Sequence, residues 1–124
     1  MNSAGLRFCG PVIRGAGRGR HLRVPTLNLD LSAVPPSLEH GIYACRVFAR
    51  GKKYPAAMHY GPRPVFKDTV SCELHLIGTT LATPATELDV EIVEFLRPIR
   101  DFPSVEDLQE QMEQDIQQAK NILL

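Results

Sequence analysis

The chain has 124 residues, which suits a single domain with its own apolar core. Its 14 basic and 14 acidic residues balance, so net charge indicates no polyanionic partner. Cys9, Cys45 and Cys72 form no Cys-x-x-Cys pair, no apolar run is long enough to span a membrane, and the N-terminus is too polar for a signal peptide. We therefore expect a cytoplasmic protein without disulfides and without a membrane partner.

The first half of the chain predicts short strands separated by turns. Residues 6–13 mix apolar and polar side chains and predict a strand that runs into a glycine-rich loop. Residues 41–48 are rich in β-branched and aromatic side chains, and residues 51–53, Gly-Lys-Lys, predict a turn into a second strand over 54–60. These two strands should form a hairpin.

Two later segments alternate in polarity and predict strands with one apolar face each. In residues 69–77, Glu73 shares a face with Ser71 and His75, so its carboxyl group should point away from the apolar side of the strand. The shared face of residues 86–96 comprises Leu88, Val90, Ile92 and Glu94.

The C-terminal stretch predicts one amphipathic helix. Ten prolines exclude long helices upstream. Ser104 can cap a helix over about 104–122, in which apolar residues recur at helical spacing and acids occupy the first turn. The expected fold is mainly β, one domain over 1–124 with an antiparallel barrel over about 5–98 and this helix.

The segment "GAGRGR" places three glycines among arginines. Glycine-rich loops bind phosphate because several backbone N–H groups can approach the oxygens, and arginines add charged donors. The spacing matches neither a Walker loop nor a dinucleotide fingerprint, so an ordinary surface turn is the alternative. The glycines of this segment are Gly15, Gly17 and Gly19, and its arginines are Arg18 and Arg20.

A proline, a hydroxyl and an amide follow this loop. Thr26 and Asn28 lie two apart on an extended segment and therefore point the same way. Their neutral oxygens suit Mg²⁺, which takes the rest of its ligands from water and nucleotide phosphates. The alternative is that both side chains cap a turn.

Four separated motifs resemble one family. "GPVIRGAGRGRHLRVPTLNLDL" followed by "GIYACRVF" resembles the signature of riboflavin kinases, as does "MHYGPRPVF". "SCELHLI" resembles the strand that carries the catalytic glutamate of that family, and "FLRPIRDFPSVEDLQEQMEQDIQQAK" resembles its closing strand and helix. Because the motifs agree in order along nearly the whole chain, chance similarity is a poor explanation.

The resemblance implies a six-stranded antiparallel barrel of Greek-key type with a C-terminal helix. It also implies transfer of the γ-phosphate of ATP to the ribityl 5′-hydroxyl of riboflavin, giving FMN and ADP, in a monomer that binds no nucleic acid. Mg²⁺ is the implied metal, with Zn²⁺ or Mn²⁺ as alternatives. Carried over by motif, Glu73 is the catalytic base, and Thr26 and Asn28 bind metal and phosphate. The phosphate loop that the resemblance implies comprises Gly15, Gly17, Gly19 and Arg20.

The chain departs from the family pattern at several positions. Arg23 stands where the family has glycine, His59-Tyr60-Gly61 where it has Asn-Ile-Gly, and Val65 where it has threonine, and the link over 78–86 differs. No nucleotidyltransferase segment precedes the barrel, so FAD synthesis is not expected. Two other functions stay open: a weakened flavin- or nucleotide-binding module, and a small barrel that binds nucleic acid through its arginine-rich loop.

Overall fold

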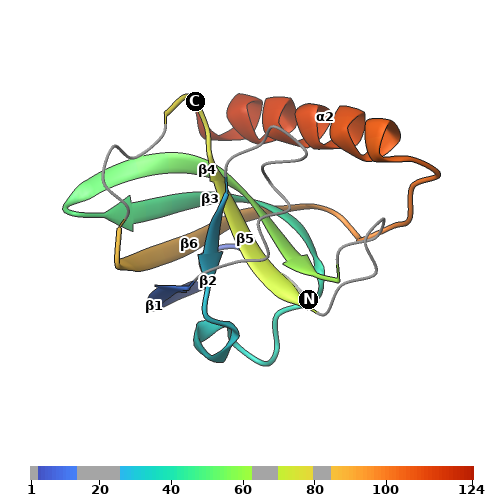
Figure 1. Ribbon diagram of the computed structural model, residues 1–124. Coiled ribbons are helices and arrows are strands. Elements are labelled where there is room, and N and C mark those ends of the chain that lie inside the picture. Colours follow the sequence, from blue (N-terminus) through green and yellow to red (C-terminus); the bar gives the residue numbers. More distant parts are fainter. Residues whose placement is uncertain (1–2, 14–25, 63–69, 80–84) are drawn as a thin grey trace.

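The computed structural model describes residues 3–13, 26–62, 70–79 and 85–124. Six strands close into an antiparallel barrel, and one long helix lies along its side (Figure 1). This architecture confirms the expected fold class. The elements are β1 (Arg7–Ile13), β2 (Leu27–Leu29), the 3-10 helix η1 (Leu31–Ala33), β3 (Gly41–Ala49), β4 (Lys52–Gly61), β5 (Ser71–Leu76), β6 (Glu87–Arg97) and α2 (Val105–Leu123).

The strand order explains why distant segments meet. Around the barrel the order is β1-β2-β5-β4-β3-β6, with β6 pairing back onto β1. Strands β3, β4 and β5 follow one another as antiparallel neighbours, and β6 returns to lie beside β3, which is a Greek-key arrangement. The same order places β2 beside β5, so the segment after the glycine-rich loop contacts the strand that carries Glu73.

Alternation along the strands fills the barrel with apolar side chains. The predicted hairpin forms between β3 and β4, and its turn residues Arg50 and Gly51 both have positive φ, 53° and 76°. Positive φ at both central residues matches the twist of the adjoining strands. Side chains that are at most 1% exposed come from β2 to β6 and include Leu29, Tyr43, Val47, Met58, Leu74, Leu88 and Val90.

Strand β6 does not keep the alternation that its sequence predicts. The register of its pairing with β3 shifts by one residue in two places. One shift lies between Ile42 and Tyr43 of β3, and the other lies between Ala44 and Cys45. An extra residue at such a bulge reverses the faces of the residues beyond it. Glu94 was expected to share the inner face with Ile92, but it pairs with Ala44 and is exposed. That expectation was wrong because periodicity alone carries no signal of the bulge.

Helix α2 begins where the sequence predicts and lies against the outside of the barrel. The Ser104 hydroxyl accepts a hydrogen bond from the Asp107 backbone N–H at 3.1 Å, which satisfies one of the free donors at the helix N-terminus. Near the other end, Ala119 is fully buried against Ala44 and Ala57. Three small side chains let this part of the helix approach the sheet closely.

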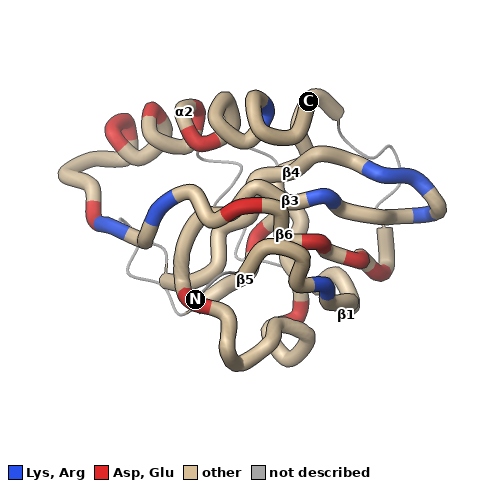
Figure 2. The backbone as a smooth tube through the Cα atoms, turned by 180° about the vertical axis from the view of Figure 1, so that it is seen from behind, with Lys and Arg blue, Asp and Glu red and all other residues tan. Residues whose placement is uncertain are grey.

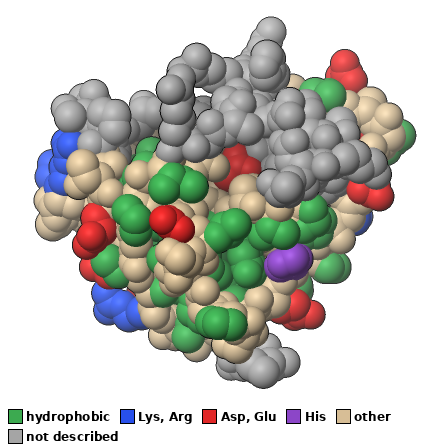
Figure 3. Space-filling view, turned by 60° about the horizontal axis from the view of Figure 1, so that its bottom comes forward, with side chains coloured by type: hydrophobic (Ala, Val, Ile, Leu, Met, Phe, Trp, Pro, Cys, Tyr) green, Lys and Arg blue, Asp and Glu red, His purple; other side chains and the backbone are tan. Residues whose placement is uncertain are grey.

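Charged side chains of the described residues lie mainly on outer surfaces. Figure 2 shows acidic positions along α2 and β6, and basic positions grouped at the β3–β4 turn. On the face seen in Figure 3, Lys and Arg side chains lie at the edges and apolar side chains occupy much of the middle. Among the helices of the described chain, none combines the length and the apolar character that crossing a membrane requires.

The Ala119 contact gives a test of how α2 is placed. Ala119→Leu should destabilise the fold by about 1–3 kcal/mol, because the added atoms meet a fully packed surface. Gln118→Leu adds an apolar side chain at the exposed neighbouring position and should have little effect. Urea unfolding of both variants measures the difference. Equal stabilities would contradict the close contact.

Candidate active site

A cleft lies between the outer face of the barrel and α2. It encloses an empty volume of about 600 Å³, with the open solvent at its mouth included. Its walls are mostly apolar, so it suits an apolar group better than a polar chain. The barrel wall includes Ile42, Ala57 and His59, and the helix wall includes Leu108, Met112 and Ile116.

Glu73 is the acid at the floor of this cleft. It lies in the middle of β5 between Cys72 and Leu74, which point into the barrel core, so its own side chain points outward. The expectation that it faces away from the apolar side of the strand is therefore confirmed. Glu73 is nevertheless only 6% exposed, because β2, β4 and α2 surround that face. It is not the solvated strand glutamate that alternation alone allows.

Two hydroxyl groups hold the Glu73 carboxylate. The Thr26 hydroxyl donates to one oxygen at 3.3 Å, and the Ser71 hydroxyl donates to the other at 2.9 Å. A buried carboxylate costs free energy unless hydrogen bonds replace its water shell. Thr26 and Ser71 supply that replacement and fix the orientation of both oxygens.

The structure brings the predicted residues Thr26, Asn28 and Glu73 together. Asn28 pairs directly with Glu73 across the β2–β5 ladder. Leu27 and Leu29 pack into the core, so Asn28 and Thr26 lie on the same outer side as the carboxylate. Positions paired in this way have Cα atoms about 4.5–5.5 Å apart. A hydroxyl, an amide and a carboxylate thus form one cluster.

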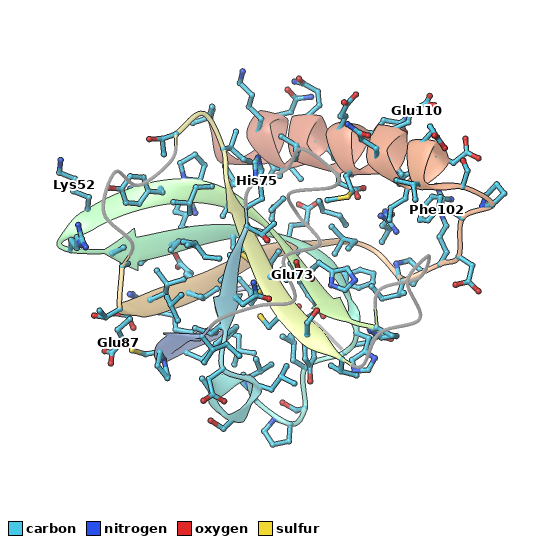
Figure 4. The ribbon with its side chains drawn as sticks, in the orientation of Figure 1. Lys52, Glu73, His75, Glu87, Phe102 and Glu110 are labelled. Carbon is cyan, nitrogen blue, oxygen red and sulfur yellow. The ribbon has the colours of Figure 1, made fainter. Side chains whose placement is uncertain are left out.

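Two histidines extend the cluster along the barrel surface. His59 of β4 pairs with Glu73, and its Nε2 lies 3.1 Å from the Pro62 carbonyl oxygen, as an N–H donor would. His75 follows on β5 and also lines the cleft. Figure 4 shows Glu73 and His75 on β5, with His75 nearer to α2. Both rings can contact whatever occupies the cleft.

An ion pair joins the barrel to the helix at the same cleft. Arg97, at the end of β6, donates from Nε and Nη2 to the two carboxylate oxygens of Asp115 at 2.9 and 2.7 Å. Gln111 Nε2 donates to the same carboxylate at 3.0 Å. Sequence reasoning missed this pair, although Asp115 falls on the apolar stripe of the helix, where an acid is unusual. Met112, one turn before Ile116 on the same helix, is half-buried and also lines the cleft.

The remaining predicted residues lie outside the described part of the chain. These are the phosphate-loop candidates Gly15, Gly17, Gly19 and Arg20. The departures at Arg23 and Val65 lie outside it as well. The phosphate-binding assignment of the loop therefore stays a prediction. Thr26 stands directly after residues 14–25, so the loop joins the described chain at the Glu73 cluster.

The oxygen atoms around Glu73 fit a hard divalent cation. Within the described residues no three His, Cys, Asp or Glu side chains gather as a metal site. The Thr26 hydroxyl, the Asn28 amide and the Glu73 carboxylate nevertheless offer oxygen donors on one surface. Mg²⁺ prefers such oxygens and needs few of them from protein when phosphates supply others. The donor set therefore fits a cation that arrives with a nucleotide.

The thiols do not compete with Glu73 as reactive groups. All three cysteines are described and are free. Burial raises the pKa of Cys72 to about 12 and holds the pKa of Cys45 well above its ordinary value. A hydrogen bond to Glu87, at 3.2 Å, is the main reason that the pKa of the exposed Cys9 rises to about 11. None of these thiols is an activated thiolate at neutral pH.

Comparison with known proteins identifies the family. A model described as "Flavokinase: Riboflavin kinase" matches residues 3–123. The chain belongs to the riboflavin kinase family. It is 36% identical to human riboflavin kinase over an alignment covering 94% of this chain and 80% of that enzyme. It is 31% identical to a trifunctional protein of Mycoplasmoides gallisepticum, covering 86% of this chain but only 16% of that protein.

Two solved structures show the same fold. The riboflavin kinase of Trypanosoma brucei superposes with a TM-score of 0.61 at 18% identity, covering 94% of this chain and 78% of that one. A Streptococcus pneumoniae protein described as a macrolide-efflux protein superposes with a TM-score of 0.80 at 25% identity, covering 95% of this chain and 39% of that one. Both likenesses support the barrel and helix seen here.

The buried carboxylate gives a test of whether Glu73 serves the fold. Glu73→Met removes a desolvated charge at similar volume, so the free energy of unfolding should stay within about 1 kcal/mol of the parent or rise. Leu74→Ala, at the adjacent core position, should instead cost about 2–5 kcal/mol. Urea unfolding measures both. A large loss in Glu73→Met would mean that the carboxylate is needed for stability.

Proposed function

We propose that the chain is an ATP:riboflavin 5′-phosphotransferase, which transfers the γ-phosphate of ATP to the ribityl 5′-hydroxyl of riboflavin and gives FMN and ADP. Membership of the riboflavin kinase family supports this activity. The observation that carries it is the buried Glu73 carboxylate, held by two hydroxyls at an apolar cleft and paired with Asn28. Ordinary packing gives no reason to bury an acid there.

The cleft suits the flavin ring. Its apolar walls on β3, β4 and α2 can contact both faces of an isoalloxazine ring, and its floor ends at Glu73. With the ring between these walls, the ribityl chain extends toward the carboxylate. Binding then holds the terminal hydroxyl close to the base, which removes much of the entropic cost of the reaction.

Glu73 acts as the general base. One carboxylate oxygen accepts the proton of the ribityl hydroxyl as that oxygen attacks the γ-phosphorus, and the bond from phosphorus to the ADP oxygen breaks. The products are FMN and ADP, and the proton leaves through Glu73. Ser71 and Thr26 keep the carboxylate in one orientation during this step. They are positioning residues in this scheme.

Thr26 and Asn28 hold the phosphate side of the site together with Gly15, Gly17, Gly19 and Arg20. Mg²⁺ is the cation that their neutral oxygens suit best, and when bound it neutralises charge on the phosphates. The glycine-rich segment contributes backbone N–H donors, and Arg20 adds a charged donor. Asn28 and the Glu73 carboxylate thus face the transferred group from the adjacent strands β2 and β5.

Removing the proton acceptor tests the mechanism. Purified protein with riboflavin and Mg-ATP should form FMN, measured by chromatographic separation of flavins. Glu73→Gln keeps size and hydrogen bonding but should lower kcat by about a hundredfold or more, because general bases contribute factors of that size. Glu110→Gln, at an exposed position of α2, should leave turnover unchanged.

Two outcomes would contradict the assignment. No FMN from the parent protein with any nucleoside triphosphate would exclude the kinase activity. Turnover of Glu73→Gln within a few-fold of the parent, with folding and flavin binding preserved, would exclude Glu73 as the base.

The cation ligands give a separate test. Thr26→Ala and Asn28→Ala each remove an oxygen donor, so both variants should need several-fold more Mg²⁺ for half-maximal rate while they stay folded. Thr86→Ala removes an exposed hydroxyl elsewhere and serves as the control. Unchanged Mg²⁺ dependence in both variants would contradict the ligand assignment, and loss of thermal stability instead would favour the capped-turn alternative. Titrations with Mn²⁺ and Zn²⁺ identify the preferred metal.

A weakened flavin-binding module is the second candidate. The observation that favours it is His59, which lies opposite Glu73 where the family pattern has asparagine. Quenching of riboflavin fluorescence by the parent protein, without FMN formation, would support this module.

The expected partners are riboflavin and ATP. A cytoplasmic location and a monomeric state remain predictions, the first supported by two buried free thiols.

A further inference from the structure

The two halves of helix α2 contact the barrel in different ways. Toward its C-terminus, Ala119 lies against Ala44 and Ala57, together with Ile77, in a buried apolar cluster. Toward its N-terminus, Leu108 and Met112 line the cleft instead. The Ala119 cluster therefore does not by itself set the separation between the sheet and this half of the helix.

The Arg97–Asp115 pair lies at the transition between these two halves. Its two parallel hydrogen bonds, 2.9 and 2.7 Å long, fix both the distance and the relative orientation of the two groups. The side chains are 16% and 5% exposed, so solvent screens the pair little. Because Arg97 ends β6 and Asp115 lies in mid-helix, the pair connects two rigid elements across the cleft.

Neighbouring groups hold the Arg97 side chain itself. Its Nη1 donates to the Pro98 carbonyl oxygen at 3.1 Å, and its guanidinium lies 5.7 Å from the centre of the Phe102 ring. Gln111 donates to Asp115 from one helical turn earlier. Figure 4 shows Phe102 beneath the beginning of α2. The pair is thus part of a hydrogen-bonded and stacked network along one wall of the cleft.

We propose that the Arg97–Asp115 ion pair is a positioning device that sets the width of the cleft and thereby determines how tightly the flavin ring is bound. This inference rests on the proposed function. A buried ion pair is seldom the most stable solution for packing two elements, because both charges lose their hydration. The two parallel hydrogen bonds of the pair fix a distance and an orientation between the elements, which an apolar contact would not do.

The expected signature is a change in riboflavin affinity with little change in chemistry. The Thr26 and Ser71 hydroxyls, which hold the Glu73 carboxylate, belong to other segments than Arg97 and Asp115, so the base and the phosphate side should keep their geometry when the pair is removed. A wider or mobile cleft binds a flat ring less well in both the ground state and the transition state. Such a change raises KM and leaves kcat nearly constant.

The test replaces the pair by apolar side chains. Arg97→Met/Asp115→Leu should fold, since such replacements are often neutral or stabilising, while the KM for riboflavin rises by about tenfold and kcat stays within about threefold. The KM for Mg-ATP should stay within about twofold, because the helix contacts the flavin side of the site. Glu113→Gln, on the exposed side of the same helix, is the matched control.

Arg97→Lys keeps the charge but loses the forked geometry, and it provides a second variant if the double variant does not fold. We expect it also to raise the KM for riboflavin. An unchanged KM in either folded variant would overturn the proposal, and so would a loss confined to thermal stability. If the parent protein forms no FMN, the proposed kinase activity is contradicted, but the role of the ion pair is not yet decided. The dissociation constant of riboflavin, measured by fluorescence quenching for the parent and the variants, then tests that role.

Discussion

Closure of a six-stranded barrel is the constraint on which the rest of the structure depends. A barrel of this size has room inside only for its own side chains. The inner positions of every strand are accordingly apolar, and residues such as Leu74, Leu88 and Val90 are fully buried. Polar chemistry must then lie on the outer face, where alternation places Glu73. An outer face is normally solvated, so a carboxylate there is buried only if another element covers it.

Helix α2 provides that cover and makes an exposed strand face into a cleft. The helix is anchored through Ala119 at one end and through Asp115 near its middle, and the space left under its N-terminal half is apolar. Glu73 becomes almost fully buried while keeping two hydroxyl donors. In such surroundings hydrogen bonds and charges act more strongly than in water. The packing of the helix and the burial of Glu73 thus depend on the same helix contact.

Likeness to known riboflavin kinases and the geometry of the site address different questions. The matched family and the human enzyme establish to which family the chain belongs. The positions of Thr26, Asn28 and Glu73 place the proposed cation ligands beside the proposed base. His59, opposite the carboxylate, is where this chain differs from the family pattern within the described site.

Local sequence determined most of the elements and the direction of their side chains. Period-two alternation placed Glu73 on the outer face, and Ser104 with its following acids began the helix, because both signals depend only on neighbouring residues. Tertiary structure alone decided the bulges that expose Glu94, the pairing of Asn28 with Glu73, and the contact of Arg97 with Asp115. These depend on strand order and helix placement, which join residues far apart in the chain, and no local pattern records such distances.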